Sequence, residues 1–390
     1  MDNLLNIENI PREVRLILNL IKADSSKGFS QYKTSDLDWD LFLRYVMHHR
    51  LHPRLHLKCK EEKIQFIPSY IKDQLMHLYR RNTLLMLQLS GEMELVSRLF
   101  AKKDIDTIFL KGPVVAQDLY GSISHRTSGD LDFLIPMEKL DEAETILVEQ
   151  GYEKDDYIET VLNDWKWRHH HVTYYHPLKQ MKLEIHWRLH PGPGKETSFH
   201  DLWKRKRVSS ITQFPVYYLG CEDLFHFLVV HGARHGWSRL RWLDDIQQIL
   251  KQPLNWELIT SLFKQNYQTQ MAGQAILLAN QLLGVSLSIE MNQFIKRNRP
   301  YRLAQEAIFY LEQMVNLHNN PLPKDVAVHH QRHVIHLMSI QQKLGYFLSL
   351  MHPFPEDVAL LPLPKKMHLL YYPLRPLLWA WRKIRKPVLF

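Results

Sequence analysis

Residues 126–134, Arg-Thr-Ser-Gly-Asp-Leu-Asp-Phe-Leu, form the stretch that decides the fold. Acidic and apolar residues alternate here, and successive side chains of a β-strand point to opposite faces. We therefore expect Asp130 and Asp132 on one face, and Leu131 and Phe133 on the other, towards a core. Neighbouring carboxylates repel each other unless a cation lies between them, and oxygen ligands favour Mg²⁺ or Mn²⁺. The pair is a candidate metal site, with a solvated turn as the alternative.

A second strand-like stretch, residues 182–187, strengthens this hypothesis. Its sequence is Lys-Leu-Glu-Ile-His-Trp, so that Glu184 and His186 share one face of the predicted strand. A third carboxylate on a neighbouring strand would complete a two-metal site, in which one metal activates a hydroxyl and the other holds a triphosphate. The alternative is an acid on an edge strand that pairs with Lys182 or with a nearby arginine.

The regions around these strands differ in pattern and predict several domains. Short β-type runs interleave with helices between residues 104 and 218, which predicts an α/β or α+β domain, and helical spacing prevails on both sides of it. The predicted strands include a hairpin formed by residues 171–175 and 181–189. The predicted units are an N-terminal helical region (1–103), the core (104–218), a C-terminal helical domain (219–352) and a Pro-rich, basic, aromatic tail (353–390).

Composition limits the class of protein. The chain has 390 residues, 45% of them hydrophobic and 23% charged, as in ordinary soluble proteins. Its two cysteines, Cys59 and Cys221, form neither a disulfide framework nor a Cys-x-x-Cys metal motif. We find no leader-like N-terminus and no apolar run of about 18 residues. These observations predict a soluble, cytoplasmic protein.

The excess of positive charge is concentrated in the tail. Lys and Arg number 50 and Asp and Glu 41, which gives a net charge of +9 with histidine neutral. Residues 358–390 hold seven Lys and Arg and no acid, which leaves only +2 for the rest of the chain. With its tyrosines and tryptophans, the tail could serve as a membrane anchor or a nucleic-acid arm. We favour packing on the helical domain instead.

Further polar residues are candidates for contacts to a ligand. Lys111 and Gly112 end a β-type run, where a lysine can neutralise a phosphate. Arg126 has two open roles, contacting a triphosphate or bracing the loop before Asp130. His231 and His235 have the spacing of one helix face, but Gly232 stands where a zinc-protease motif has glutamate. We therefore expect a structural or substrate-contact role for this histidine pair.

These elements, in this order, resemble the nucleotidyltransferase superfamily that includes DNA polymerase beta. More narrowly, the chain is similar to the bacterial uncharacterised nucleotidyltransferase family. The resemblance covers about residues 75–255. The matching residues are Lys111-Gly112, Tyr120, Arg126, Asp130, Asp132, Glu184, His186, Trp187, His231, His235, Trp237, Arg239, Arg241, Trp242 and Asp245.

The resemblance implies an α+β fold, with a nucleotidyltransferase-type mixed sheet flanked by helical regions. It implies Mg²⁺- or Mn²⁺-dependent transfer of a nucleoside monophosphate from a nucleoside triphosphate such as ATP, with release of pyrophosphate. Asp130, Asp132 and Glu184 would bind the metals and be catalytic. The residues expected to contact the nucleotide are Lys111, Gly112, Arg126, Ser128, His186, Arg239 and Arg241.

Two departures from the superfamily concern the phosphate-binding turn. Pro113 follows Gly112 where the superfamily has serine or glycine, so one backbone N–H donor is lost. Lys111 is the candidate replacement. The insert between Pro113 and Gly129 is also longer than usual, and both departures fit the narrower family.

The acceptor is left open by the sequence. Relatives lie beside bacterial peptide-modification genes, which favours a peptide or small-molecule hydroxyl. The Lys-Gly turn with Asp-x-Asp also resembles toxin nucleotidyltransferases that act on tRNA. Sugar transfer from a nucleotide sugar, and a catalytically silent binding module, are further alternatives. Three clustered acids argue against the silent module, since they repel each other without a metal.

Overall fold

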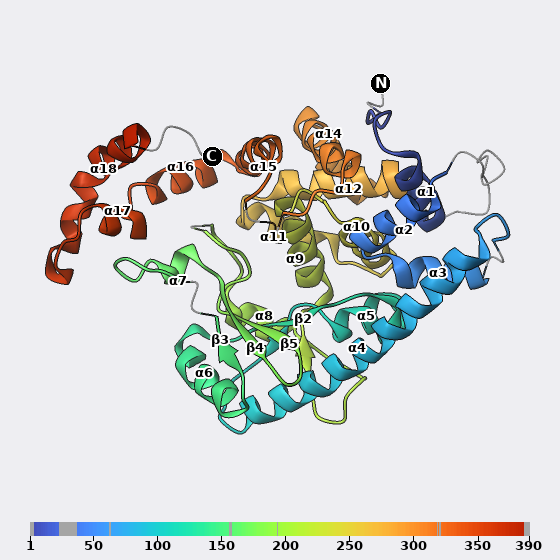
Figure 1. Ribbon diagram of the computed structural model, residues 1–390, viewed down its shortest axis with the longest axis horizontal. Helices are drawn as coiled ribbons and strands as arrows, with labels where there is room; N and C mark the ends of the chain where they lie inside the picture. Colours follow the sequence, from blue (N-terminus) through green and yellow to red (C-terminus); the bar gives the residue numbers. More distant parts are fainter. Residues whose placement is uncertain are drawn as a thin grey trace.

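The computed structural model describes residues 4–22, 37–61, 64–155, 158–192, 194–317, 319 and 321–385. Over these residues, helices surround one mixed β-sheet (Figure 1), as the α+β prediction requires. Residues 386–390 of the predicted tail lie outside the described residues. No helix in the described part of the chain combines the length and the apolar character needed to cross a membrane.

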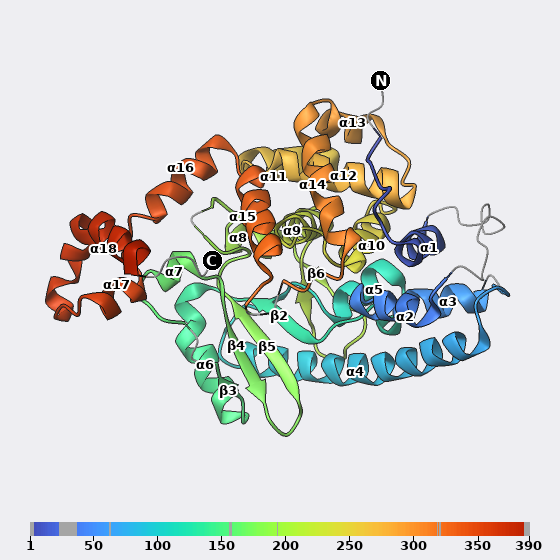
Figure 2. The same ribbon diagram turned by 45° about the horizontal axis from the view of Figure 1, so that its top comes forward.

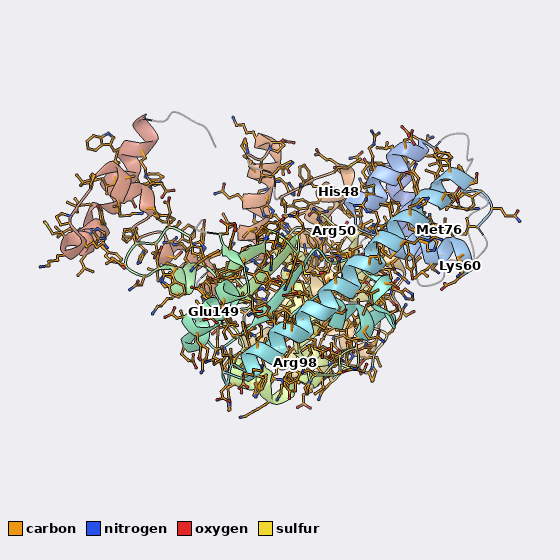
Figure 3. The ribbon with its side chains drawn as sticks, turned by 60° about the horizontal axis from the view of Figure 1, so that its bottom comes forward. His48, Arg50, Lys60, Met76, Arg98 and Glu149 are labelled. Atoms are coloured by element: carbon orange, nitrogen blue, oxygen red, sulfur yellow. The ribbon has the colours of Figure 1, made fainter. Side chains whose placement is uncertain are left out.

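The N-terminal region is helical. Its elements are α1 (Arg12–Ile21), α2 (Trp39–His48), α3 (His52–Glu61) and α4 (Ser69–Ala101). The long helix α4 begins directly after Pro68, and its 33 residues contain no proline. At 1.5 Å per residue it spans about 50 Å. In Figure 3, α4 runs from Met76, near Lys60 of α3, to Arg98. Arg98 and Glu149 lie on the same side of the molecule.

The described strands form a seven-stranded sheet in the order β3-β4-β5-β2-β1-β7-β6. The strands are β1 (Ile108–Phe109), β2 (Asp130–Leu134), β3 (Glu153–Lys154), β4 (His171–His176), β5 (Met181–His186), β6 (Arg207–Val208) and β7 (Tyr217–Tyr218). The expected hairpin is β4 and β5, which pair antiparallel. Strand β5 pairs in parallel with β2, and in this register Asp132 lies opposite Glu184.

The two faces of β2 have different neighbours. The Phe133 ring lies 5.6 Å from the Phe100 ring of α4 in an edge-on contact, so the apolar face of β2 packs on the long helix. The acidic residues point to the other face. The helices within this region are α5 (Pro113–Tyr120), η3 (Ile123–His125), η4 (Met137–Lys139), α6 (Leu140–Glu149), α7 (Trp165–Arg168) and α8 (Phe199–Arg205).

The C-terminal helices pack against the sheet region and against the N-terminus. They are α9 (Cys221–Arg234), α10 (Leu240–Ile249), α11 (Trp256–Gln265), α12 (Thr269–Leu283), α13 (Ile289–Ile295), α14 (Asn298–Glu312) and α15 (Lys324–Leu337). Buried apolar residues from Leu5 to Leu337 form one continuous core. The turn between α9 and α10 requires Gly236, because its φ is +60° and a Cβ there would lie 2.3 Å from the Tyr310 ring.

The first described residues, Leu4 and Leu5, form a strap that is tied to two late helices. The Leu5 backbone N–H donates to Gln281 Oε1 of α12 at 2.7 Å. The Tyr301 hydroxyl of α14 donates to the Leu4 carbonyl, also at 2.7 Å. The first described residues are thus tied to helices almost 300 positions later in the sequence.

The last helices form an arm on one side of the molecule (Figures 1 and 2). They are α16 (Ile340–Ser349), α17 (Pro355–Leu360), η5 (Lys365–Leu370) and α18 (Tyr371–Arg385). The arm packs on itself through an ion pair between Arg375 and Asp357. It packs on α7 through the Arg168 guanidinium, 4.0 Å from the Phe354 ring centre. As expected, the tail also contacts the end of the predicted C-terminal helical domain, where Arg375 Nε donates to the Leu350 carbonyl at 3.2 Å. The contact with α7 of the predicted core was not expected.

Candidate active site

The acidic cluster lies where β2 and β5 run side by side. Asp132 is fully buried, and its Oδ1 lies 3.1 Å from Lys111 Nζ and 3.3 Å from His186 Nε2. His186 Nε2 is also 3.6 Å from Glu184 Oε2. Lys182 Nζ contacts Glu184 Oε1 at 2.6 Å. The parallel register therefore gathers two of the predicted acids, a histidine and two lysines at one place.

The charges of this cluster shift one another's pKa values. Burial raises the pKa of Asp130, and the neighbouring charge of Asp132 raises it further. Burial alone would raise the pKa of Glu184, but the hydrogen bond from His186 and the charge of His171 hold it well below its usual range. Burial lowers the pKa of His186, yet its contacts to Asp132 and Glu184 more than offset this effect and raise the pKa.

The donor set at this place fits a divalent cation. One ligand atom each from Asp132, Glu184 and His186 lies within 4.8 Å of the others. Asp132 Oδ2 is buried and has no hydrogen-bond partner among the described residues. A buried carboxylate oxygen without a partner is costly unless a cation or a water satisfies it. Two carboxylates and an imidazole are ligands that Mn²⁺ accepts, and the carboxylates suit Mg²⁺.

The cluster differs in one member from the expected set of Asp130, Asp132 and Glu184. Two groups of potential ligands occur in the described part of the chain, and both contain His186. The second group consists of His170, His171 and His186. Asp130 belongs to neither group, although it lies two residues before Asp132 on the same strand, β2.

The turn after β1 brings Lys111 to the acids. Gly112 has φ of +89°, and a Cβ at this position would approach Leu131 Cδ2 to 3.3 Å. Both observations favour glycine. Pro113 is the first residue of α5, where its fixed φ suits the start of a helix. The Lys111 side chain is 13% exposed and directly contacts Asp132.

Arg126 and Ser128 are bound within the protein. Arg126 is 2% exposed and donates from Nε and Nη2 to both carboxylate oxygens of Asp245, at 2.8 and 2.9 Å. Tyr120 also donates to Asp245, at 2.7 Å. Of the two roles open to Arg126, this pairing fits the bracing role. The Ser128 hydroxyl donates to the Asp130 carbonyl at 3.1 Å and so supports the start of β2.

Arg239 and Arg241 lie at the junction with the N-terminal helices. Arg239 donates to the His48 carbonyl at the end of α2 at 2.7 Å; Figure 3 labels His48 and Arg50 in this region. Arg241 donates to the Thr127 carbonyl, while its Nε is buried without a hydrogen-bond partner among the described residues. Burial and the charge of Arg126 lower the pKa of Arg241 to about 9. Arg241 thus contacts the loop that precedes Asp130.

The His231–His235 pair packs around an aromatic side chain. The two imidazole rings lie 4.6 Å apart, and the Trp242 ring lies 5.4 Å from His231 and 5.1 Å from His235. Burial lowers the pKa of His231 well below its usual range, and the charge of Lys111 adds to this effect. The rings of the pair thus pack against Trp242.

Sequence reasoning did not include His171 among the site residues. Its Nε2 lies 3.8 Å from Glu184 Oε2, and burial with the charge of His186 lowers the pKa of His171 to about 4. The predicted hairpin could have pointed to His171, because the pairing of its two strands places His171 opposite His186. The expected strand boundaries alone did not fix that register.

Comparison with known proteins identifies the family. No curated protein matches this chain. The model of the uncharacterised nucleotidyltransferase family matches residues 35–284, which are 250 of the 390 residues. This range is wider than the predicted resemblance, since it adds α2, α3, α11 and α12. It contains the acidic cluster, the Lys111 turn and the His231–His235 pair. The chain belongs to the uncharacterised nucleotidyltransferase family.

Proposed function

We propose that the protein transfers a nucleoside monophosphate from a nucleoside triphosphate to a hydroxyl acceptor, with Mg²⁺ or Mn²⁺ bound at the acidic cluster. Family membership supports nucleotidyl transfer in general. The observation that carries the metal assignment is the buried Asp132 carboxylate, which has an unpartnered Oδ2 and faces Glu184 across the parallel strand pair.

Asp130, Asp132 and Glu184 would hold the metal, with His186 beside them. Bound there, the metal supplies positive charge that stabilises the triphosphate and lowers the pKa of the acceptor hydroxyl. Lys111 lies 3.1 Å from Asp132 and adds a second cation for phosphate oxygens. Gly112 lets the backbone turn next to Leu131, which keeps Lys111 at the acids.

The transfer exchanges one bond to phosphorus for another. The acceptor oxygen forms a bond to the α-phosphorus, and the bond from that phosphorus to the oxygen bridging to the β-phosphate breaks. Pyrophosphate leaves with the electron pair of the broken bond, and the hydroxyl proton passes to solvent. A peptide or small-molecule hydroxyl is our proposed acceptor, and transfer to RNA is the alternative outcome of the test.

Calorimetry with ATP, GTP, CTP and UTP tests the metal and nucleotide assignments without knowledge of the acceptor. We expect at least one triphosphate to bind in the presence of Mg²⁺ and not in the presence of EDTA. The double substitution Asp130→Asn with Asp132→Asn should abolish this binding. Asp141→Asn, at an exposed position of α6, is the matched control and should bind like the unmodified protein.

Labelling then identifies the acceptor. The protein is incubated with Mg²⁺, the triphosphate that binds, labelled at the α-phosphorus, and a cell extract. Label in a peptide or metabolite supports the proposed acceptor, and label in RNA supports the alternative. The metal and nucleotide assignment fails if no triphosphate binds, or if the double variant binds as tightly as the unmodified protein.

A further inference from the structure

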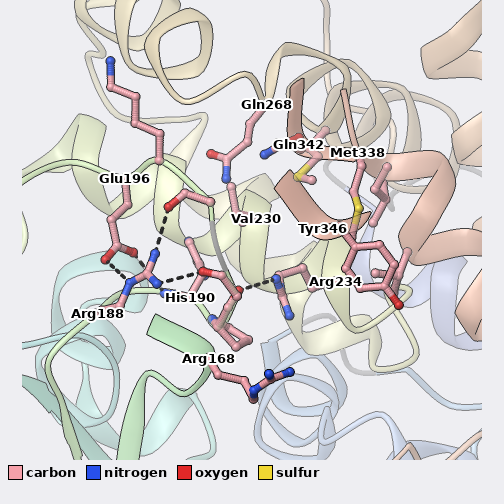
Figure 4. Close-up of a pocket in the computed structure, with 17 residues that line it drawn as sticks. Arg168, Arg188, His190, Glu196, Val230, Arg234, Gln268, Met338, Gln342 and Tyr346 are labelled. Carbon is pink, nitrogen blue, oxygen red and sulfur yellow. Dashed lines mark hydrogen bonds and ion pairs between the residues drawn. The ribbon is translucent and has the colours of Figure 1, made fainter. Parts of the chain in front are cut away.

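A second candidate site lies beyond the C-terminal end of β5. It is a cavity of about 250 Å³ between the segment that follows β5 and helices α9, α12, α15 and α16. Figure 4 shows the side chains around it. Its lining includes four basic residues, Arg168, Arg188, Lys195 and Arg234, and one acidic residue, Glu196.

Two of these basic residues are neutralised within the protein. Arg188 Nε donates to Glu196 Oε1 at 2.9 Å, and its other nitrogens donate to the carbonyls of Trp167, Gly192 and Gly194. Arg168 Nε donates to Asp164 Oδ2 at 2.6 Å. The guanidinium of Arg188 therefore organises the loop that forms one wall of the cavity and has no donor nitrogen left over.

Arg234 differs from these two arginines. Its Nη1 donates to the Pro191 carbonyl at 3.2 Å, and no carboxylate of the described residues lies within 4.0 Å of its guanidinium. Burial, with the charge of Arg188 nearby, lowers the pKa of Arg234 to about 10. A guanidinium has five N–H donors and stays charged at neutral pH. Arg234 therefore brings into the cavity a positive charge that no carboxylate of the described residues neutralises.

Two buried polar atoms of the cavity lining, Arg168 Nη2 and His190 Nε2, have no hydrogen-bond partner among the described residues. His190 is 8% exposed, and its Nε2 makes no hydrogen bond with the described residues. Its ring stacks on Phe227, 5.5 Å away between centres. Burial, with the charge of Arg234, keeps the pKa of His190 well below its usual range. A neutral imidazole and a guanidinium without a counter-ion are suitable partners for a bound oxyanion or its acid.

The cavity also has an apolar side. Val230, Met271, Val334, Leu337 and Met338 line it together with the charged residues. A small inorganic anion would leave this apolar surface in contact with water. An organic acid, with its charged group at Arg234 and an apolar body against these side chains, would use both surfaces.

The cavity lies next to the acidic cluster. Arg188 follows His186 by two residues, and its carbonyl oxygen lies 3.4 Å from His186 Nδ1. The His170 ring is 5.2 Å from the His186 ring. Burial lowers the pKa of His170 well below its usual range, and the charge of Arg234 contributes to this effect. The loop that forms one wall of the cavity thus directly contacts His186 of the acidic cluster.

We propose that this cavity binds an anionic group of the acceptor, a carboxylate or a phosphate, so that the hydroxyl substrate is an organic acid. This inference rests on the proposed nucleotidyl transfer. The guanidinium of Arg234 holds the acidic group, and the apolar wall holds the carbon skeleton. The hydroxyl group then lies towards His170 and the acidic cluster.

Calorimetry with phenyl phosphate, benzoate and the neutral analogue phenol tests the site. We expect one or both anions to bind the unmodified protein and phenol not to bind. Arg234→Gln should weaken anion binding about 10- to 100-fold, because it removes a charge-assisted hydrogen-bond donor. Arg234→Lys should retain part of the affinity. Arg332→Gln, at an exposed arginine of α15, is the matched control and should change nothing.

Each variant is checked for folding by thermal unfolding and titrated with the Mg²⁺–nucleotide complex. Unchanged nucleotide affinity together with weaker anion binding supports the acceptor site. Parallel loss of both affinities in Arg234→Gln would mean that the cavity holds the phosphates of the nucleotide, and would overturn the proposal. Absence of anion binding to the unmodified protein would also overturn it. Anion binding without any nucleotide binding would instead remove the proposed function and leave only an anion site.

Discussion

Arg126, in the loop before β2, and Arg234, at the cavity beyond β5, are both arginines whose charge the protein has taken largely out of water. Arg126 has the complete carboxylate of Asp245 as its partner. Arg234 has one backbone carbonyl. Burial lowers the pKa of both, but Asp245 raises that of Arg126 above its ordinary value, whereas that of Arg234 stays at about 10.

The difference in partners distinguishes a buried charge that stabilises the fold from a buried charge that is available to a ligand. A buried ion pair with complete hydrogen bonding fixes one conformation and leaves nothing for a substrate. A buried charge without a counter-ion costs stability, and binding of an opposite charge recovers that cost. The acidic cluster resembles the Arg234 region in this respect, since Asp132 Oδ2 has no partner among the described residues.

The largest expected effect comes from breaking the Arg126 pair. Arg126→Gln should lower the free energy of unfolding by about 3–5 kcal/mol, because it leaves the Asp245 carboxylate buried without its cation. Urea unfolding at pH 7 measures this. Arg98→Gln, which breaks an exposed ion pair with Glu94, is the control and should cost less than about 1 kcal/mol. Equal effects of the two substitutions would contradict the structural role of Arg126.

The second largest expected effect is a loss of affinity for the metal ion. Glu184→Gln removes one carboxylate of the cluster and should weaken Mn²⁺ binding by roughly 100-fold or more, since changes even outside the ligand set cost 10–100-fold. Titration of Mn²⁺ followed by electron paramagnetic resonance measures the affinity. Glu149→Gln, at an exposed position of α6 (Figure 3), serves as the control. Mn²⁺ binding that survives Glu184→Gln unchanged would place the metal elsewhere.

The smallest expected effect is an increase in the free energy of unfolding. Arg234→Met should raise the free energy of unfolding by about 1 kcal/mol, because it removes a buried charge without a counter-ion. The pKa of Arg234 is lowered from 12.5 to about 10, so the charged form disfavours folding at every pH below about 10. The gain should therefore be equal at pH 6 and pH 8 in urea unfolding. A loss of stability at both pH values would show that Arg234 already has a counter-ion.

The strands that carry the acids could be predicted because their signal is local. Alternation over residues 130–134 and 182–187 is visible within six residues, and it predicts which side chains share a face. The long helix α4 was predictable for the same reason, since its apolar spacing continues without proline. By contrast, β3, β6 and β7 have two residues each, too few for any period to appear.

Contacts between distant segments could not be predicted from the sequence. The partner of Arg126 is 119 residues away, and without it the sequence left phosphate binding and loop bracing equally open. The unpartnered state of Arg234 depends on which carboxylates fold close to it, and no sequence pattern encodes that. The sequence likewise identified the tail as basic and aromatic, but not that Phe354 would pack on Arg168 of α7.

The strap formed by Leu4 and Leu5 affects the order in which the protein folds. Leu5 and Leu4 bind side chains that lie 276 and 297 residues later in the chain. At a synthesis rate of about 5–20 residues per second, roughly 15–60 s pass before those partners leave the ribosome. During that interval the apolar side of α1 has no C-terminal helix to cover it. Closure of the strap is therefore among the last steps of folding on the ribosome.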